Sequence, residues 1–185
     1  MTRSPGGGRA WIRSLAALGA VVVGAALWTA SGRAAGQDPA AEPNANDLAA
    51  GLRIYRQKAD CQACHGWAGD GRNMDTQMPS GANLRTTRLG RAGIVYAIKC
   101  GRPGREMPAF DRLAYTDDRC NGTTRADLDR QNLRLPDPAA TLQPREIEQL
   151  ADFLFAKVIG KGPMDHAACV EFWGSDVDVC AEFPD

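Results

Sequence analysis

The stretch Cys61-Gln62-Ala63-Cys64-His65 decides how this chain folds. Two thiols three positions apart can add to the two vinyl groups of a haem, and the adjacent histidine can ligate the iron. A zinc site would need a second ligand pair at matching spacing, and a thioredoxin-like redox motif would lie in a βαβ pattern. The sequence contains neither. It therefore predicts one covalent haem c, with Cys61 and Cys64 as attachment residues and His65 as an axial ligand of the iron.

A haem iron held by His65 takes its second axial ligand from elsewhere, usually from a methionine or a histidine. Met107 is the preferred candidate, because it heads Met-Pro-Ala-Phe after the turn Gly101-Arg-Pro-Gly104, and a stiff loop can hold a weak thioether ligand. The packing alternative stays open, since methionine often fills gaps in a core. Met78 lies only 13 residues after His65, which is short for reaching the opposite haem face. The remaining candidates are Met74, Met164 and His166.

Hydrophobic periodicity predicts helices and no sheet. A helix capped by Asn46 or Asp47 runs through Ala59, a second covers Arg88 to Cys100, and a third covers Pro144 to Ile159. One short helical turn is expected around Ala126 to Asp129. Apolar residues of the third helix fall on one face: Ile147, Leu150, Ala151, Leu154, Phe155 and Val158. The fold class is therefore all-α, built around one haem.

The N-terminus has the features of an export signal. Arg3, Arg9 and Arg13 precede an uncharged run, residues 14–32, whose apolar part resembles a secretory h-region. Residues 1–36 are therefore predicted to be a signal peptide, or an N-terminal membrane anchor if the run is retained, because it is long enough to span a bilayer. Residues 37–46 read as a linker. Both alternatives place the rest of the chain outside the cytoplasmic membrane, in the periplasm of a bacterium.

The charges are unevenly distributed. All 22 acidic residues follow Gly36, so the exported part carries 18 − 22 = −4. Residues 85–105 hold six basic and no acidic side chains, whereas residues 164–185 hold six acidic side chains and no Lys or Arg. These stretches are either ordinary solvated surface or docking faces that steer a redox partner. The acidic charge and the predicted export argue against nucleic acid as a partner.

Four cysteines remain outside the haem motif: Cys100, Cys120, Cys169 and Cys180. An even number in an oxidising compartment predicts two disulfides rather than free thiols. Three connectivities are possible. Cys100–Cys120 and Cys169–Cys180 are preferred, because each pair would staple a segment that is short of apolar residues. Residues 161–185 are accordingly expected to form an acidic, disulfide-stapled C-terminal extension.

The chain resembles class I cytochromes c over residues 47–160, with an insertion between Phe110 and Gln143. The resemblance rests on Gly51-x3-Tyr55, the motif Cys61 to Gly66, Gly69-Asp-Gly71, Asn83-Leu84, Met107-Pro108 and a final amphipathic helix. It implies that Gly51 and Tyr55 lie where the first and last helices cross, facing Leu150 and Leu154.

The same resemblance implies a proline carbonyl against the Nδ1–H of the proximal histidine. Pro79 is the candidate, in Met78-Pro79-Ser80-Gly81 rather than the usual Gly-Pro. Tyr55 and Trp67 are further candidates for the haem environment, and Trp67 either flanks the haem edge or fills the pocket. The extension is loosely similar to those of periplasmic cytochromes that serve quinoprotein dehydrogenases.

The expected function is single-electron transfer by a His65/Met107 haem c, with no enzymatic activity of its own. The partner would be a periplasmic dehydrogenase, a terminal oxidase or both, and a membrane would be involved only if residues 14–32 are retained. The main alternative is a cytochrome subunit fixed in an oxidoreductase complex. A haem enzyme or gas sensor with a labile Met107 is a third class.

Overall fold

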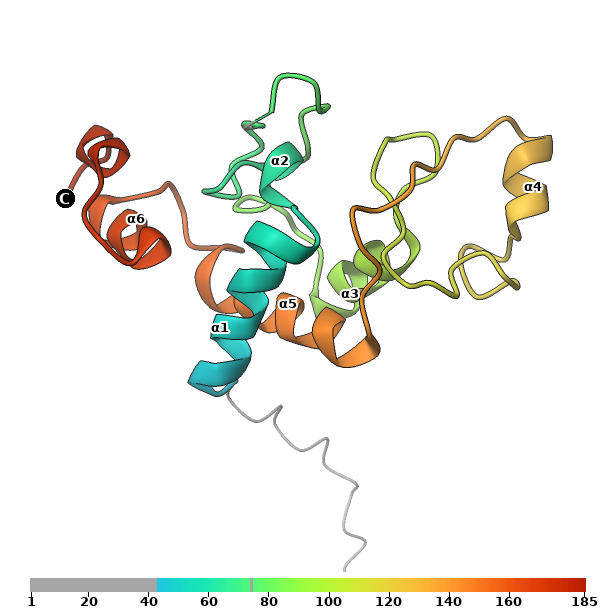
Figure 1. The fold of residues 1–185 in the computed structure, drawn as a ribbon, viewed down its shortest axis with the longest axis horizontal. Helices are drawn as coiled ribbons and strands as arrows, with labels where there is room; N and C mark the ends of the chain where they lie inside the picture. The colour runs from blue at the N-terminus through green and yellow to red at the C-terminus, as the bar shows by residue number, and fades with distance from the viewer. Residues whose placement is uncertain (1–42, 74) are drawn as a thin grey trace, which may run out of the picture. The chain divides into compact units, whose positions relative to one another are not determined.

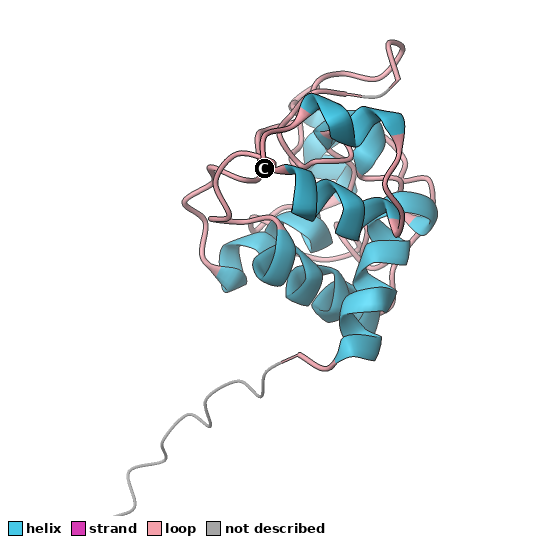
Figure 2. Cartoon of the chain, turned by 90° about the vertical axis from the view of Figure 1, so that its left-hand side faces the viewer, coloured by secondary structure: helices cyan, strands magenta, loops and turns pink. Residues whose placement is uncertain are grey.

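A computed structural model describes residues 43–73 and 75–185 of the chain. This part consists of helices and loops and contains no β-strand (Figure 2). The all-α prediction is therefore confirmed. The predicted signal or anchor lies outside the described residues. Within the described ranges, no helix combines the length and the apolar character that crossing a membrane requires.

The helices follow one another as in Figure 1. Their bounds are α1 Ala45–Arg53, continued by a π-helical segment at Ile54–Lys58, α2 Gln62–His65, α3 Arg91–Cys100, α4 Arg125–Arg130, α5 Pro144–Lys157, α6 His166–Trp173 and a final 3-10 helix at Asp178–Glu182. Three of these were predicted with nearly these bounds, and α4 was predicted as one turn. The short helix α2, helix α6 and the 3-10 helix were not predicted.

Helix α1 begins two or three residues earlier than predicted, since Asn46 or Asp47 was the expected N-cap. The side chain of Asn44 accepts a hydrogen bond from the backbone N–H of Asp47, so Asn44 is the N-cap. Helix α5 begins as predicted, with Pro144 in the first turn. Its N-terminus is closed by a capping box, in which Glu146 accepts from the backbone N–H of Gln143 at 2.8 Å.

Helices α1 and α5 cross each other (Figure 1). Gly51 lies at this crossing. A Cβ at Gly51 would overlap the carbonyl oxygen of Gln149 and lie 2.5 Å from the Cβ of Phe153. Only glycine permits this close approach. The prediction of the crossing is confirmed, although the atoms nearest to Gly51 belong to Gln149 and Phe153, one residue before Leu150 and Leu154 in each case. Next to the crossing, the rings of Tyr55 and Phe153 lie 5.7 Å apart.

The buried side chains form two clusters. The larger one joins α1, the π-helical segment, α3, α5 and α6, and it includes Tyr55, Ile98, Phe110, Leu150, Leu154 and Phe172. The smaller cluster joins the insertion to the end of α3 and the segment after it, and consists of Cys100, Ala109, Tyr115, Cys120, Leu128 and Leu135. The insertion is thus not a loose loop, because it has a small core of its own.

Both preferred disulfides are present, Cys100–Cys120 in the smaller cluster and Cys169–Cys180 in the extension. In the extension, Asp165 caps α6 by accepting from the backbone N–H of Ala168 at 2.8 Å. No helix was predicted in this segment, because its apolar residues do not recur with helical periodicity. Helix α6 forms because a capped turn, a disulfide and aromatic contacts fix it, and none of these produces a repeating apolar pattern.

Candidate haem-binding site

The side chain of His65 is held at the end of α2 by one hydrogen bond. Its Nδ1 lies 2.8 Å from the carbonyl oxygen of Ala82. A carbonyl can only accept, so Nδ1 carries the proton and Nε2 keeps the lone pair that can bind a metal. Such an orienting partner is typical of metal-binding histidines.

The prediction that Pro79 supplies this carbonyl is wrong, because the oxygen belongs to Ala82. The sequence offered a signal for the correct residue. In the Gly-Pro pair that the resemblance implies, the residue that supplies the carbonyl directly follows a glycine. In this chain Ala82 directly follows Gly81 and precedes Asn83-Leu84. Alanine can take the place of proline because the contact uses only the backbone oxygen.

Gly81 allows the segment to approach the imidazole closely. A Cβ at this position would lie 2.6 Å from Nδ1 of His65, so a larger residue would displace the ring. The backbone N–H of Gly81 also donates to the carbonyl of Cys64 at 2.7 Å. The segment that orients the imidazole is thereby tied to the Cys-Xaa-Xaa-Cys-His motif itself.

The titratable groups of the motif are uncharged. Burial lowers the pKa of His65, although the hydrogen bond to Ala82 acts in the opposite direction. Burial raises the pKa of the Cys61 thiol to about 12 and also raises the pKa of Cys64. The motif therefore presents a neutral imidazole, the form that binds metal, and two thiols beside the larger core.

Tyr55 supports the motif from the α1 side. It is fully buried, and its hydroxyl donates to the carbonyl of Gly66 at 2.6 Å. Burial raises the pKa of this hydroxyl above its usual range, so it stays protonated and remains a donor. In this structure Tyr55 fixes the chain directly after His65.

Met107 lies on a tight turn at the end of α3. The backbone N–H of Arg102 donates to the carbonyl of Met107 at 2.9 Å and closes the turn. Gly101 has φ +62°, and a Cβ there would lie 2.6 Å from the carbonyl oxygen of Met107. The turn therefore requires glycine at this position. The side chain of Met107 is half-buried.

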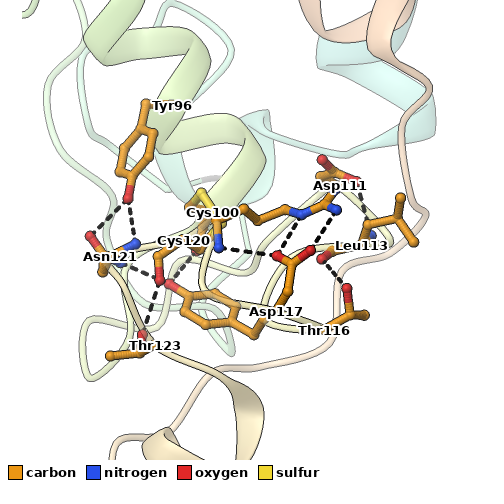
Figure 3. Close-up of a disulfide and its surroundings, with 11 residues drawn as sticks. Tyr96, Cys100, Asp111, Leu113, Thr116, Asp117, Cys120, Asn121 and Thr123 are labelled. Atoms are coloured by element: carbon orange, nitrogen blue, oxygen red, sulfur yellow. Dashed lines mark hydrogen bonds and ion pairs between the residues drawn. A yellow bond between two sulfur atoms is a disulfide. The ribbon is translucent and has the colours of Figure 1, made fainter.

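The insertion is joined to the end of α3, directly before this turn (Figure 3). The disulfide Cys100–Cys120 ties the end of α3 to the insertion, and the hydroxyl of Tyr115 donates to the carbonyl of Cys100 at 2.9 Å. Asn121 links the two tyrosines of the region: its side-chain N–H donates to the Tyr115 oxygen, and its Oδ1 accepts from Tyr96.

The other candidates for the distal ligand are less well placed. Met78 is 41% exposed, on a loop. Met164 lines a cavity between α1, α5 and α6. His166 lies 3.2 Å from the carboxylate of Asp176 within the extension. Met74 lies outside the described residues.

Trp67 packs against the extension. Its ring lies 5.3 Å from that of Phe172, 5.7 Å from that of Trp173 and 5.5 Å from that of Phe183. The guanidinium of Arg56 lies over the rings of Phe172 and Trp173, at 5.1 and 4.8 Å from their centroids. The sequence analysis did not predict this cluster. The signal that could have indicated it is the presence of three aromatic residues in an otherwise polar tail, Phe172, Trp173 and Phe183, in addition to Trp67.

The cavity that Met164 lines has a volume of about 370 Å³. Neither His65 nor Met107 borders it, so it is distinct from the place where an iron bound to His65 would lie. The residues of the Cys-Xaa-Xaa-Cys-His motif themselves fit a haem c. They supply a pair of thiols and a neutral imidazole whose Nδ1 is occupied, and Gly81, outside the motif, leaves room for the ring.

Comparison with known proteins supports this interpretation. The family model described as "Cytochrome C oxidase, cbb3-type, subunit III" matches residues 46–122. A search of curated proteins and a search of solved structures found no match. The matched residues contain the attachment motif, the segment that orients His65, and the Met107 turn. Residues 46–122 therefore form a cytochrome c domain, and the cofactor of such a domain is a covalently bound haem c.

Proposed function

We propose that this protein is a single-electron carrier whose haem is attached at Cys61 and Cys64 and ligated by His65 and Met107. The observation that carries the proposal is that contacts of the chain itself fix the positions of both proposed ligands. Ala82 fixes the tautomer of His65, and Gly101, the Arg102–Met107 hydrogen bond and the Cys100–Cys120 disulfide hold the Met107 turn.

The haem supplies a reversible one-electron change at the iron. With His65 and Met107 both bound to the iron, no position would remain open for a substrate, and the thioether of Met107 would raise the reduction potential. The chain contributes stiffness, because ligands held on braced segments move little when the charge of the iron changes. These properties favour electron transfer over catalysis.

The ligand assignment is tested by Met107→Ala. The oxidised wild-type protein should show the weak near-infrared charge-transfer band from sulfur to iron, and the variant should lose it and bind carbon monoxide when reduced. Met78→Ala is the matched control and should retain the band. Retention in Met107→Ala together with loss in Met78→Ala would refute the assignment.

We further propose that the partner is a periplasmic dehydrogenase or a terminal oxidase with an acidic rim. Residues 85–105 present fewer unpaired positive charges at the surface than their six basic side chains suggest. Arg85 is buried, and Arg91 pairs with Glu148 and Asp152. Arg102 and Arg105, next to Met107, are exposed and have no ion-pair partner in residues 43–73 and 75–185. These two arginines form the proposed docking charge.

Reversing both charges should slow bimolecular electron transfer and weaken its dependence on salt, without altering the haem spectrum. Reversal of Arg72, an exposed arginine that pairs with Asp70, serves as the control. Equal rates for wild type and for the Arg102/Arg105 variant at low salt would contradict this docking site.

A second candidate is a cytochrome subunit fixed in an oxidoreductase complex. The description of the matching family model, which names an oxidase subunit, favours it. N-terminal sequencing of the exported protein separates the two. A start near residue 37 in the soluble fraction supports the carrier, whereas an intact residue 14–32 segment in the membrane fraction supports the subunit.

A further inference from the structure

Arg85 is a buried cation that joins three segments of the chain. Only 5% of its surface is exposed. Its Nη1 donates to the carbonyl of Ala68 at 3.2 Å, its Nη2 donates to the carbonyl of Pro163 at 3.2 Å, and its Nε donates to the carbonyl of Gly162. The guanidinium thus connects the loop after His65 to the first residues of the C-terminal extension.

The charge of Arg85 has no carboxylate bound to it. No ion pair involves this side chain in the described ranges 43–73 and 75–185, and the three hydrogen-bond partners are backbone carbonyls. The acidic residues that act on it from a distance are Asp165 and Asp70. Asp165 caps α6 and Asp70 pairs with Arg72, so both have other partners. Burial lowers the pKa of Arg85, but a guanidinium remains charged at neutral pH.

This charge lies within the framework that holds His65. Ala68 is three residues after His65, in a loop where the N–H of Gly71 donates to the carbonyl of His65 at 2.8 Å. Arg85 itself is three residues after Ala82, whose carbonyl orients the imidazole. A positive charge in a medium of low dielectric constant favours the reduced iron, which carries one positive charge fewer than the oxidised iron.

We propose that Arg85 is a positioning residue through which the C-terminal extension raises the reduction potential of the haem. The extension supplies two of the three carbonyls that hold the guanidinium, those of Gly162 and Pro163. The proposal rests on the proposed function as an electron carrier. It also removes Arg85 from the docking charge that the sequence predicted, since a buried group cannot meet a partner.

The experiment compares Arg85→Gln and Arg85→Lys by spectroelectrochemical titration of the purified holoprotein. Arg85→Gln removes the charge and should lower the potential, whereas Arg85→Lys keeps the charge and should restore most of the wild-type value. Each tenfold change in the ratio of oxidised to reduced protein at fixed potential corresponds to about 59 mV for one electron. Arg88→Gln, an exposed arginine three residues later, is the control and should leave the potential unchanged.

Truncation after Lys161 tests the part played by the extension. It should lower the potential in the protein with Arg85 and have a much smaller effect in Arg85→Gln, because both changes remove the same interaction. If the truncated protein does not fold, the Gln and Lys variants still decide the role of the charge. A trypsin-resistance assay reports separately whether the extension stays docked.

Two results would overturn the proposal. One is a wild-type potential in Arg85→Gln, with or without loss of protease resistance, because Arg85 would then be only a structural clasp. The other is an equal drop in Gln and Lys variants that both lose the near-infrared band, because loss of the Met ligand would explain it. Absence of that band from the wild type would instead refute the ligand assignment, and the effect of Arg85 on the potential would still be measured.

Discussion

Removal of the Cys100–Cys120 disulfide by the double substitution Cys100→Ala/Cys120→Ala should destabilise the protein and release the Met107 turn. The two cysteines are 20 residues apart. Chain entropy then assigns the crosslink roughly 3.3 kcal/mol, a large part of the typical 5–15 kcal/mol stability of a domain. Alanine is preferable to serine, because both sites are buried and a hydroxyl there would lack a partner.

Cys169→Ala/Cys180→Ala is the matched control. These cysteines are 11 residues apart, so the same relation gives about 2.8 kcal/mol. The two double variants should therefore lose a similar free energy of unfolding, but they should differ in which part of the protein unfolds first. The first disulfide belongs to the cluster of the insertion beside Met107, and the second belongs to the extension.

The assay is urea unfolding of the oxidised holoprotein, followed by far-ultraviolet circular dichroism and by the near-infrared band. In Cys100→Ala/Cys120→Ala the band should disappear at a lower urea concentration than the helical signal. In the control variant the two signals should disappear together. A loss below about 1 kcal/mol, or identical behaviour of the band in both variants, would refute the idea that this disulfide braces the Met107 turn.

Three further substitutions test the framework of the site. Gly101→Ala should abolish the near-infrared band, because its Cβ would lie 2.6 Å from the carbonyl oxygen of Met107. Tyr55→Phe should cost about 1–3 kcal/mol in urea unfolding, since it leaves the carbonyl of Gly66 without its donor. Glu146→Gln should make the free energy of unfolding depend less on pH in the acidic range. The reason is that the pKa of Glu146 is lowered, mainly by the hydrogen bond from the backbone N–H of Gln143. Its stabilisation is therefore present above the unfolded-state pKa and is lost as the pH falls through the folded-state pKa.

Each of these substitutions has a control. Gly122→Ala also replaces a glycine with positive φ, but nothing lies within 4 Å of its Cβ, so it should cost about 1–2 kcal/mol and keep the band. Tyr96→Phe removes an exposed hydroxyl and should cost less than Tyr55→Phe. For Glu146→Gln the control is the wild type itself, unfolded over the same series of pH values. Equal effects within any of these pairs would contradict the corresponding contact.

The sequence by itself predicted those features that depend on residues close together in the chain. The attachment motif, the helix at Pro144 and the two disulfides follow from spacing, capping and the parity of cysteines. The crossing of α1 and α5 at Gly51 was predicted only through the resemblance to class I cytochromes c. The Met107 turn was predicted through its glycines and proline, and its role as a ligand stays a prediction.

The tertiary structure decided the features that depend on contacts between distant residues. The carbonyl that orients His65 comes from Ala82, and a backbone oxygen leaves no signature in the type of its residue. Arg85 looks like one more surface cation in the sequence, yet carbonyls from both sides of it bury its charge. The extension has no helical periodicity, and α6 is ordered by a disulfide and by the ring of Trp67. Burial and hydrogen bonding belong to the folded chain as a whole, so only the fold could assign these roles.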